Sequence, residues 1–483
     1  MSEPVYEPTK ESLRAHPVPE WYDDAKLGIF IHWSVSSVPA FAPRGSLEQV
    51  LTGEGQAASP YAEWYWNSLK LPGSAVQKHH HEVYGDRPYE SFADDYRAGL
   101  EQWQPEAWAR AFREAGARYV VLVTKHHDGF CLWPSEVRHS DPRRKDWHTG
   151  RDVVGELAAA VRAEGLRFGI YYSGGLDWTF DDRPLEGLID LVTKMPGGDY
   201  PAYAAAQVRE LVARVAPDVL WNDISWPDRK EKLWKLIADY YNAVPEGVVN
   251  DRWMHRTRLL HVLRFEPLAR WLDGMLRRRL AQQEGMASPP TPTVYDYRTP
   301  EYATFPDIQK GKWECVRGID MSFGYNRNSL PEDFLSHEEL LHSFVDIVSK
   351  NGNLLLNVGP RGEDAQIPDI QLERLRWLGA FLRDAGEAIH GSRPWTRAEG
   401  MTREGIAVRF TVNAGQLYAT LLGTPATRAV TLVDVPVADE ASVRVLGQAE
   451  APCVTREGGG DVKIEAAGDW ADRPVQCLCL GPV

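Results

Sequence analysis

Short apolar runs alternate with amphipathic helical segments over residues 20–390, and this alternation limits the possible folds more than any other feature. The segments PEAWARAFREAG, RDVVGELAAAVRAEG and YAAAQVRELVARVAP each precede an apolar run and end near Gly or Pro, as helices do. Continuous apolar strands covered by helices are typical of a parallel sheet buried on both faces. The predicted strands are Gly28–Trp33, Arg118–His126, Arg167–Ser173, Asp218–Asp223, Val248–Asp251, Thr293–Tyr297, Ile319–Tyr325 and Asn353–Val358.

Eight such strands favour an α/β fold with a closed (β/α)8, TIM-like barrel. An open, doubly wound sheet is the alternative. No GxGxxG motif follows the first strand, so the nucleotide-binding version of the open sheet has little support.

The pattern changes after residue 392. The segments IAVRFTV, QLYATLLG, AVTLVDV, SVRVLG, DVKIEA and VQCLCLG have a period near two and are separated by Gly, Pro and Asn turns. We therefore expect a barrel domain over residues 1–392 and a C-terminal β-sandwich domain over residues 393–483. Residues 255–284 fit neither pattern and predict two helices split at Pro267, which we interpret as an insertion at the barrel rim.

Composition narrows the class of partner. Acidic residues outnumber basic ones by 68 to 54, for a formal net charge of −14, which argues against a nucleic-acid partner. The five cysteines include no CxxC pair, so we expect neither a disulfide framework nor a zinc cluster. The N-terminal residues are polar and no apolar run could cross a bilayer. We expect a cytoplasmic protein without membrane contact, and a homo-oligomer stays open.

Polar and aromatic side chains gather at the carboxyl ends of the predicted strands, where barrels of this kind carry their catalytic groups. Phe30 and His32 lie two residues apart on one strand and therefore share a face, and so do Trp221 and Asp223. Such a mixture of hydrogen-bonding groups and aromatic surface fits a sugar site. Aromatic filling of a large core is the alternative.

Two carboxylic acids could carry out hydrolysis of a glycosidic bond. Asp223 ends an apolar strand, so its carboxylate is expected to be shielded yet reachable, which suits attack on an anomeric carbon. Glu301 follows the TVYDY run in the loop RTPEY and could donate a proton to the leaving oxygen. The alternatives are a helix N-cap for Asp223 and an ordinary surface carboxylate for Glu301.

Two histidine-rich segments could bind a metal, but we expect none. His126 and His127 are adjacent on one predicted strand, so their side chains point to opposite faces and a shared metal is awkward. The HHHE run at residues 79–82 is interpreted as a solvated face.

Motifs at these strand ends resemble those of the α-L-fucosidases of glycoside hydrolase family 29. The resemblance runs in order to about residue 392 through WYDDAKLGIFIHWSVSSVPAF, YAEWYW, AGARYVVLVTKHHDGFCLWPS, GIYYSGGLDW, DVLWNDISWP, VVNDRW, TPEY, KWECVRGIDMSFGYNRN and SKNGNLLLNVGPRGED. It implies a (β/α)8-like domain followed by a β-sandwich. It also implies retaining hydrolysis of terminal α-L-fucosyl residues from fucosylated oligosaccharides or glycosides, with no metal or other cofactor.

Carried onto this sequence, the resemblance implies Asp223 as nucleophile and Glu301 as general acid/base. The implied hydroxyl-binding residues are His32, Glu63, Trp64, His126, His127, Tyr171 and Arg252, with Tyr172 replacing Tyr171 if the strand register differs by one. The implied pocket for the C5 methyl group consists of Phe30, Trp221 and Phe323. The alternatives are an exo-glycosidase for a related sugar, such as an α-L-galactoside, and a catalytically silent sugar-binding protein.

Overall fold

The computed structural model describes residues 5–45, 55–257, 267, 271–275, 278, 291–437 and 439–483. Within these residues, seven parallel strands form one sheet in the order β5-β4-β3-β2-β1-β7-β6. The strands are β1 (Leu27–Ile31), β2 (Tyr119–Lys125), β3 (Arg167–Ser173), β4 (Val219–Asp223), β5 (Val248–Val249), β6 (Trp313–Gly318) and β7 (Gly352–Val358).

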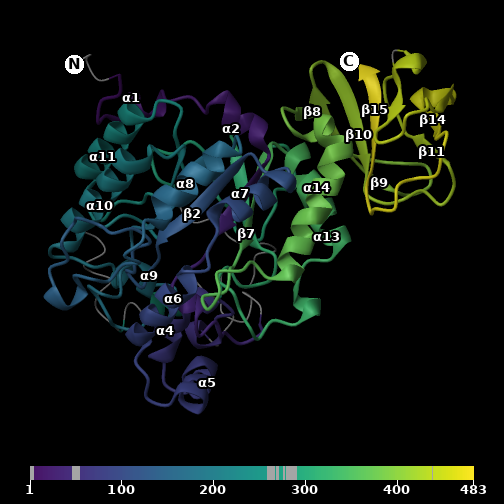
Figure 1. Cartoon of the computed structure of the whole chain (residues 1–483). Helices are drawn as coiled ribbons and strands as arrows, with labels where there is room; N and C mark the ends of the chain where they lie inside the picture. The colour runs from purple at the N-terminus through teal and green to yellow at the C-terminus, as the bar shows by residue number, and fades with distance from the viewer. Residues whose placement is uncertain are drawn as a thin grey trace.

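Helices surround this sheet, and α14 separates it from the C-terminal strands (Figure 1). The three helical segments predicted from the sequence are confirmed as α7, α8 and α10. The helices are α1 (Lys10–Arg14), α2 (Glu20–Ala25), α4 (Tyr65–Leu69), α5 (Ala75–Tyr84), α6 (Phe92–Leu100), α7 (Pro105–Glu114), α8 (Val153–Ala163), α9 (Asp190–Thr193), α10 (Tyr200–Val215), α11 (Lys230–Ala243), α13 (His337–Ser349) and α14 (Asp369–Ile389). No helix among the described residues is long and apolar enough to span a bilayer.

The strands bury alternate residues in two different cores. In β1, Ile29 and Ile31 belong to the large cluster that packs against the helices, whereas Phe30 belongs to a smaller cluster on the opposite, inner face. In β3, Tyr172 belongs to the outer cluster and Tyr171 to the inner one, which selects Tyr171 as the residue that faces the site. The predicted shared face of Phe30 and His32 is confirmed, since their rings lie 4.6 Å apart.

Six of the eight predicted strands are confirmed with shifts of a residue or two at their ends, and two are wrong. Residues 293–297 and 319–325 contain no strand longer than a single bridge, and β6 lies between them at Trp313–Gly318. The sequence of β6, WECVRG, carries two charged residues that interrupt its apolar pattern. Glu314 is nevertheless fully buried on the inner face, because neutral donors from distant segments hold its carboxyl group.

The segment of residues 297–301 forms single bridges with both edges of the sheet. Tyr297 pairs with Asn250 beyond the end of β5, and Arg298 and Glu301 pair with Trp313 and Val316 in β6. This segment therefore runs from the end of β5 to β6 and places Glu301 beside β6.

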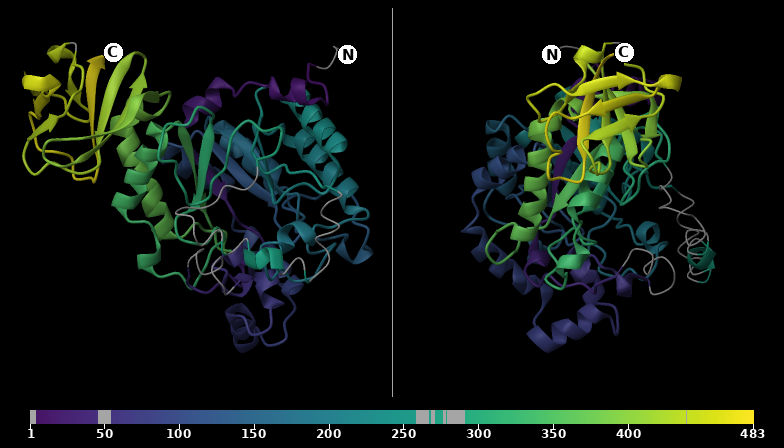
Figure 2. Two further views of the ribbon diagram at one scale, coloured as in Figure 1. Left: turned by 180° about the vertical axis from the view of Figure 1, so that it is seen from behind. Right: turned by 90° about the vertical axis from the view of Figure 1, so that its right-hand side faces the viewer.

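The C-terminal residues form two antiparallel sheets around one apolar cluster (Figure 2). The first sheet has the order β12-β15-β10-β9-β8 and the second the order β11-β14-β13. All six predicted strands are present, and β8 and β13 join them. The strands are β8 (Arg393–Met401), β9 (Ala407–Asn413), β10 (Gln416–Leu421), β11 (Ala429–Leu432), β12 (Arg444–Val445), β13 (Cys453–Arg456), β14 (Val462–Glu465) and β15 (Gln476–Pro482). Most of the predicted insertion at 255–284 lies outside the described residues. Among the residues of the insertion that are described, 271–275 are helical.

Candidate active site

The predicted site residues converge at the carboxyl ends of β1 to β4 and in the segments that follow β1, β5 and β6. Asp223 is the last residue of β4, and its side chain is 13% exposed. Tyr171 Oη donates to Asp223 Oδ2 at 2.8 Å, and Arg252 Nη1 donates to Asp223 Oδ1 at 3.1 Å. The carboxylate is thus held from two sides and retains a path to solvent, which is what an attacking carboxylate requires.

Arg252 joins the two predicted catalytic carboxylates. Its Nη2 lies 2.6 Å from Glu301 Oε1, while its Nη1 binds Asp223. Burial lowers the pKa of Arg252, but the charges of Glu301 and Asp223 outweigh this effect and the net shift is upward. Glu301 and Asp223 are 78 residues apart in sequence but lie within reach of one guanidinium group. Thr299 also accepts from this guanidinium, through its hydroxyl and its carbonyl oxygen.

The backbone after each carboxylate adopts an unusual conformation. Ile224 and Ser225 have φ values of 50° and 72°, and Tyr302 has a φ of 49°. Positive φ is costly for a β-branched residue such as Ile224, so the surrounding contacts must impose it. Gly175 permits the turn, because a Cβ at this position would lie 1.5 Å from the Ile224 carbonyl oxygen. The turn after β3 and the turn after β4 therefore fit only with glycine here.

Three buried imidazoles line the site. His32 Nδ1 lies 2.6 Å from Asn357 Oδ1, and His127 Nδ1 lies 2.7 Å from the hydroxyl of Ser173. Burial lowers the pKa of His32 to about 4 and lowers those of His126 and His127 well below the usual value. These rings are therefore neutral at pH 7, and each can donate from one nitrogen and accept at the other.

The ring of His126 lies between the other two imidazoles and has an unpaired nitrogen. Its centroid is 5.7 Å from that of His32 and 4.0 Å from that of His127. The expectation that His126 and His127 point to opposite faces is therefore wrong, because β2 ends at Lys125 and both residues follow it. His126 Nδ1 is buried and has no hydrogen-bond partner among the described residues. The histidine pair does not converge on one point with Asp128, whose carboxylate accepts from Tyr89 and Ser34 instead.

The loop that follows β1 contributes Glu63 and Trp64 from one 3-10 turn, Ala62–Trp64. Glu63 Oε2 accepts from Gly324 N at 2.7 Å, and burial raises the pKa of Glu63 to about 7. The ring of Trp64 meets that of His127 edge to face at 5.0 Å. Both predicted residues therefore belong to the same cluster as the strand ends.

An aromatic wall completes the pocket. Phe30 lies 5.4 Å from Trp221, which stacks on Tyr171 at 5.4 Å, and Phe323 lies 5.0 Å from His32, measured between ring centroids. Phe323 comes from the loop after β6 and not from a strand as predicted. Eleven of the twelve predicted residues thus form one contact network of polar groups and aromatic rings, and Glu63 joins it through Gly324, the residue after Phe323.

Sequence reasoning missed several residues that hold this network. Asn357 fixes the His32 ring. Asn357 lies two residues after the inward-facing Leu355 on β7, so the strand period of two could have predicted that it faces the site. Tyr61 was not singled out, although its buried hydroxyl has no partner among the described residues. The HHHE run is also only partly a solvated face, because His80 is buried and lies 2.8 Å from the Tyr65 hydroxyl.

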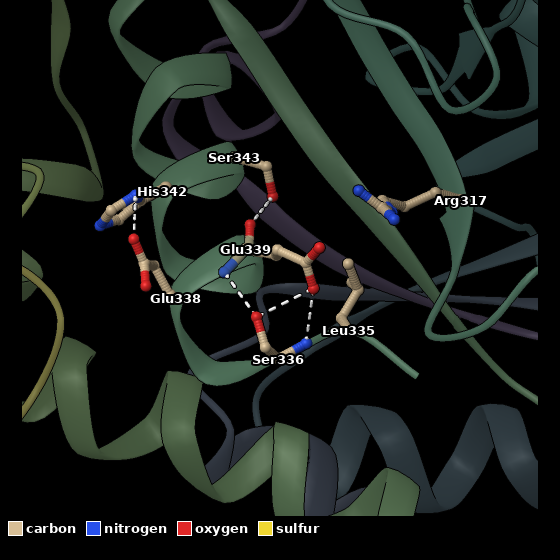
Figure 3. A pocket seen from close by; sticks show the side chains of 7 residues that line it. All are labelled: Arg317, Leu335, Ser336, Glu338, Glu339, His342 and Ser343. Atoms are coloured by element: carbon tan, nitrogen blue, oxygen red, sulfur yellow. Dashed lines mark hydrogen bonds and ion pairs between the residues drawn. The ribbon is translucent and has the colours of Figure 1, made fainter. Parts of the chain in front are cut away.

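A depression of about 740 Å³ elsewhere on the surface lies over the start of α13 (Figure 3). Its polar groups largely pair within one helix: Glu339 accepts from Ser336 at 2.9 Å, and Glu338 lies 3.8 Å from His342. None of the predicted site residues lines it. We therefore assign the candidate active site to the strand ends and not to this depression.

Comparison with known proteins agrees with the geometry of the site. A family model described as alpha-L-fucosidase matches residues 1–387. Tissue alpha-L-fucosidase of Bos taurus is 33% identical over 455 residues, which cover 92% of this chain and 83% of the relative. Alpha-L-fucosidase of Branchiostoma floridae is 33% identical over 448 residues, covering 89% of this chain and 84% of the relative. A crystal structure of the Thermotoga maritima alpha-fucosidase in complex with fucose is 39% identical, covers 98% of this chain and 99% of its own, and superposes with a TM-score of 0.79. The chain therefore belongs to the α-L-fucosidase family.

Proposed function

We propose that this protein is an exo-acting, retaining α-L-fucosidase that removes terminal fucosyl residues from oligosaccharides or glycosides. The observation that carries the proposal is the single guanidinium of Arg252 bound to both Asp223 and Glu301. It brings two acids that are distant in sequence to one place, as hydrolysis by double displacement requires. Relatives that match most of the chain are named as fucosidases, and one solved relative holds fucose.

In the first step, Asp223 attacks the anomeric carbon while Glu301 protonates the leaving oxygen. The Asp223–C1 bond forms as the bond from C1 to the aglycone oxygen breaks, and the proton of Glu301 passes to that oxygen. In the second step, Glu301 takes a proton from water, whose oxygen attacks C1 and releases Asp223. Two inversions at C1 give net retention.

Arg252 is proposed to exchange partners during this cycle. The first step needs a proton on Glu301, and a protonated carboxyl group holds Arg252 less strongly than a carboxylate does. Entry of the sugar is therefore expected to separate Glu301 from Arg252 and to leave the guanidinium on Asp223. Tyr171 keeps Asp223 oriented throughout, since it binds the other carboxylate oxygen.

Recognition of the sugar is assigned to the remaining side chains. Neutral His32, His126 and His127 can each donate to or accept from a ring hydroxyl, and Glu63 and Trp64 lie on the same side of the pocket. The wall of Phe30, Trp221 and Phe323 offers no strong partner for a hydroxyl at C6 and suits a methyl group.

The test is hydrolysis of an aryl α-L-fucoside followed by proton NMR. We expect α-L-fucose as the first product, before mutarotation forms the β anomer, and no release from the aryl β-L-fucoside. A β anomer formed first would contradict double displacement. Turnover of the aryl α-L-galactoside at a rate comparable to the fucoside would instead favour the related-sugar alternative, and binding of fucose without hydrolysis would favour the silent one.

We also propose that the parallel sheet closes into a barrel of the (β/α)8 type, with residues 297–301 in place of a regular strand. The bridges from this segment to Asn250 and to β6 support closure. The cytoplasmic location, the homo-oligomer and the division at residue 392 stay predictions.

A further inference from the structure

Behind the aromatic wall lies a buried carboxyl group for which the proposed mechanism has no use. Glu314 is fully buried on the inner face of β6. Its Oε2 accepts from the hydroxyls of Tyr22 at 2.8 Å and Tyr119 at 2.5 Å, and its Oε1 accepts from Trp221 Nε1 at 3.3 Å. These donors come from α2, β2 and β4, so the carboxyl group ties three distant parts of the barrel together.

The ring of Tyr119 reaches Glu314 because β1 leaves space for it. A Cβ on Gly28 would lie 2.3 Å from the Tyr119 ring, so only glycine fits beneath it. Tyr22 and Tyr119 donate to one oxygen, which leaves the other oxygen to the indole. The carboxyl group is therefore built into the core with its second oxygen directed at Trp221.

This contact decides which edge of Trp221 faces the pocket. The indole stacks on Tyr171 with 20° between the ring planes, and the Arg252 guanidinium lies 4.7 Å from its ring centroid. Both groups pack against the indole, so its remaining freedom is set by where the N–H finds an acceptor. Because Glu314 holds the N–H toward the core, the pocket meets a carbon edge.

We propose that Glu314 is a specificity-determining residue that makes the Trp221 wall selective for a 6-deoxy sugar. The inference rests on the proposed function, in which Trp221 faces C6 of the sugar. An indole N–H turned toward the pocket would donate to a C6 hydroxyl, whereas a carbon edge leaves that hydroxyl without a partner. A buried hydroxyl without a partner is disfavoured, so L-fucose is selected over L-galactose, which differs only by this hydroxyl.

The test compares kcat/KM for aryl α-L-fucoside and aryl α-L-galactoside. Apolar pockets reject a substrate with one additional hydroxyl by roughly 100-fold, so we expect a preference of that order in the wild type. Glu314→Leu removes the acceptor and frees the indole, and the preference is expected to fall about tenfold, mainly through better turnover of the galactoside. Glu314→Gln retains an acceptor oxygen and is expected to keep the preference.

Two further variants separate specificity from structural support. In a Trp221→Phe background there is no N–H to redirect, so Glu314→Leu should leave the preference of that background unchanged. Tyr22→Phe removes another donor from the same carboxyl group and should lower the unfolding temperature without changing the preference. If Glu314→Leu does not fold, Glu314→Asp replaces it, because a side chain one methylene shorter withdraws from Trp221 Nε1.

The outcomes distinguish this inference from the function itself. A wild type that does not cleave the fucoside would refute the proposed function. An active Glu314→Leu or Glu314→Asp enzyme with the wild-type preference would overturn the role of Glu314 alone. A loss of preference that is equally large in the Trp221→Phe background would overturn it too, because the indole N–H would then not be responsible.

Discussion

Replacement of Asp223 by glycine tests the proposed mechanism most directly. The substitution removes the nucleophile and leaves its two side-chain donors, Tyr171 Oη and Arg252 Nη1, facing an empty space. Loss of a catalytic nucleophile or its partner base costs about 10⁴- to 10⁶-fold in kcat in well-studied hydrolases. We expect a fall of at least about 10⁴-fold in kcat, or about 5 kcal/mol in the activation barrier.

The space left in Asp223→Gly should accept a small anion. Azide could lie between the same phenol and guanidinium and attack C1 from the side that Asp223 occupied. With an aryl α-L-fucoside, azide is expected to restore release of the aryl group and to yield β-L-fucosyl azide, identified by NMR. Asp223→Asn is the matched control, because its side chain fills the space and excludes azide. Substantial hydrolysis by Asp223→Gly without azide, or equal rescue of both variants, would refute the assignment.

Three other substitutions test separate parts of the argument. Glu301→Ala should reduce kcat/KM far more for poor leaving groups than for activated aryl groups, and an equal loss on both would reject the acid role. Gly175→Ala should displace the turn at Ile224 and reduce kcat/KM about 100-fold, whereas Gly311→Ala, where a Cβ meets nothing within 4 Å, should have no effect. Burial raises the pKa of Glu314 from 4.5 to about 7, so the folded state retains a proton there that the unfolded chain has released. The free energy of unfolding should therefore fall by up to about 3 kcal/mol as pH rises from 4.5 to 7, and urea titrations of Glu314→Gln should lack this component of the fall.

The inward residues of the confirmed strands were predictable because strand geometry is local. A period of two placed Phe30 with His32 and Trp221 with Asp223, and the structure has both pairs on the inner side. The choice between Tyr171 and Tyr172 needed only the register of β3, which the structure resolves in favour of Tyr171. Local pattern therefore identified the strand ends and most of the site.

The part of the sheet around β6 could not be read in the same way, because the predicted strands at 293–297 and 319–325 lie on either side of it. β6 contains Glu314, and a charged residue in a short run normally argues against a buried strand. Its burial depends on hydroxyl and indole donors that are 93 to 292 residues away in sequence. Phe323 was assigned to the pocket through its motif, yet it reaches the pocket from a loop after β6 and not from the predicted strand.

The amino-acid sequence by itself determined the alternation of strands and helices, the inward positions on each confirmed strand and, through its motifs, the family. Each of these depends on neighbouring residues or on the identity of short segments. Only the tertiary structure decided that Arg252 joins Asp223 to Glu301 and that Glu314 orients Trp221. Those contacts join residues brought together by the folded sheet, and no local period or propensity encodes a distance between side chains on different strands.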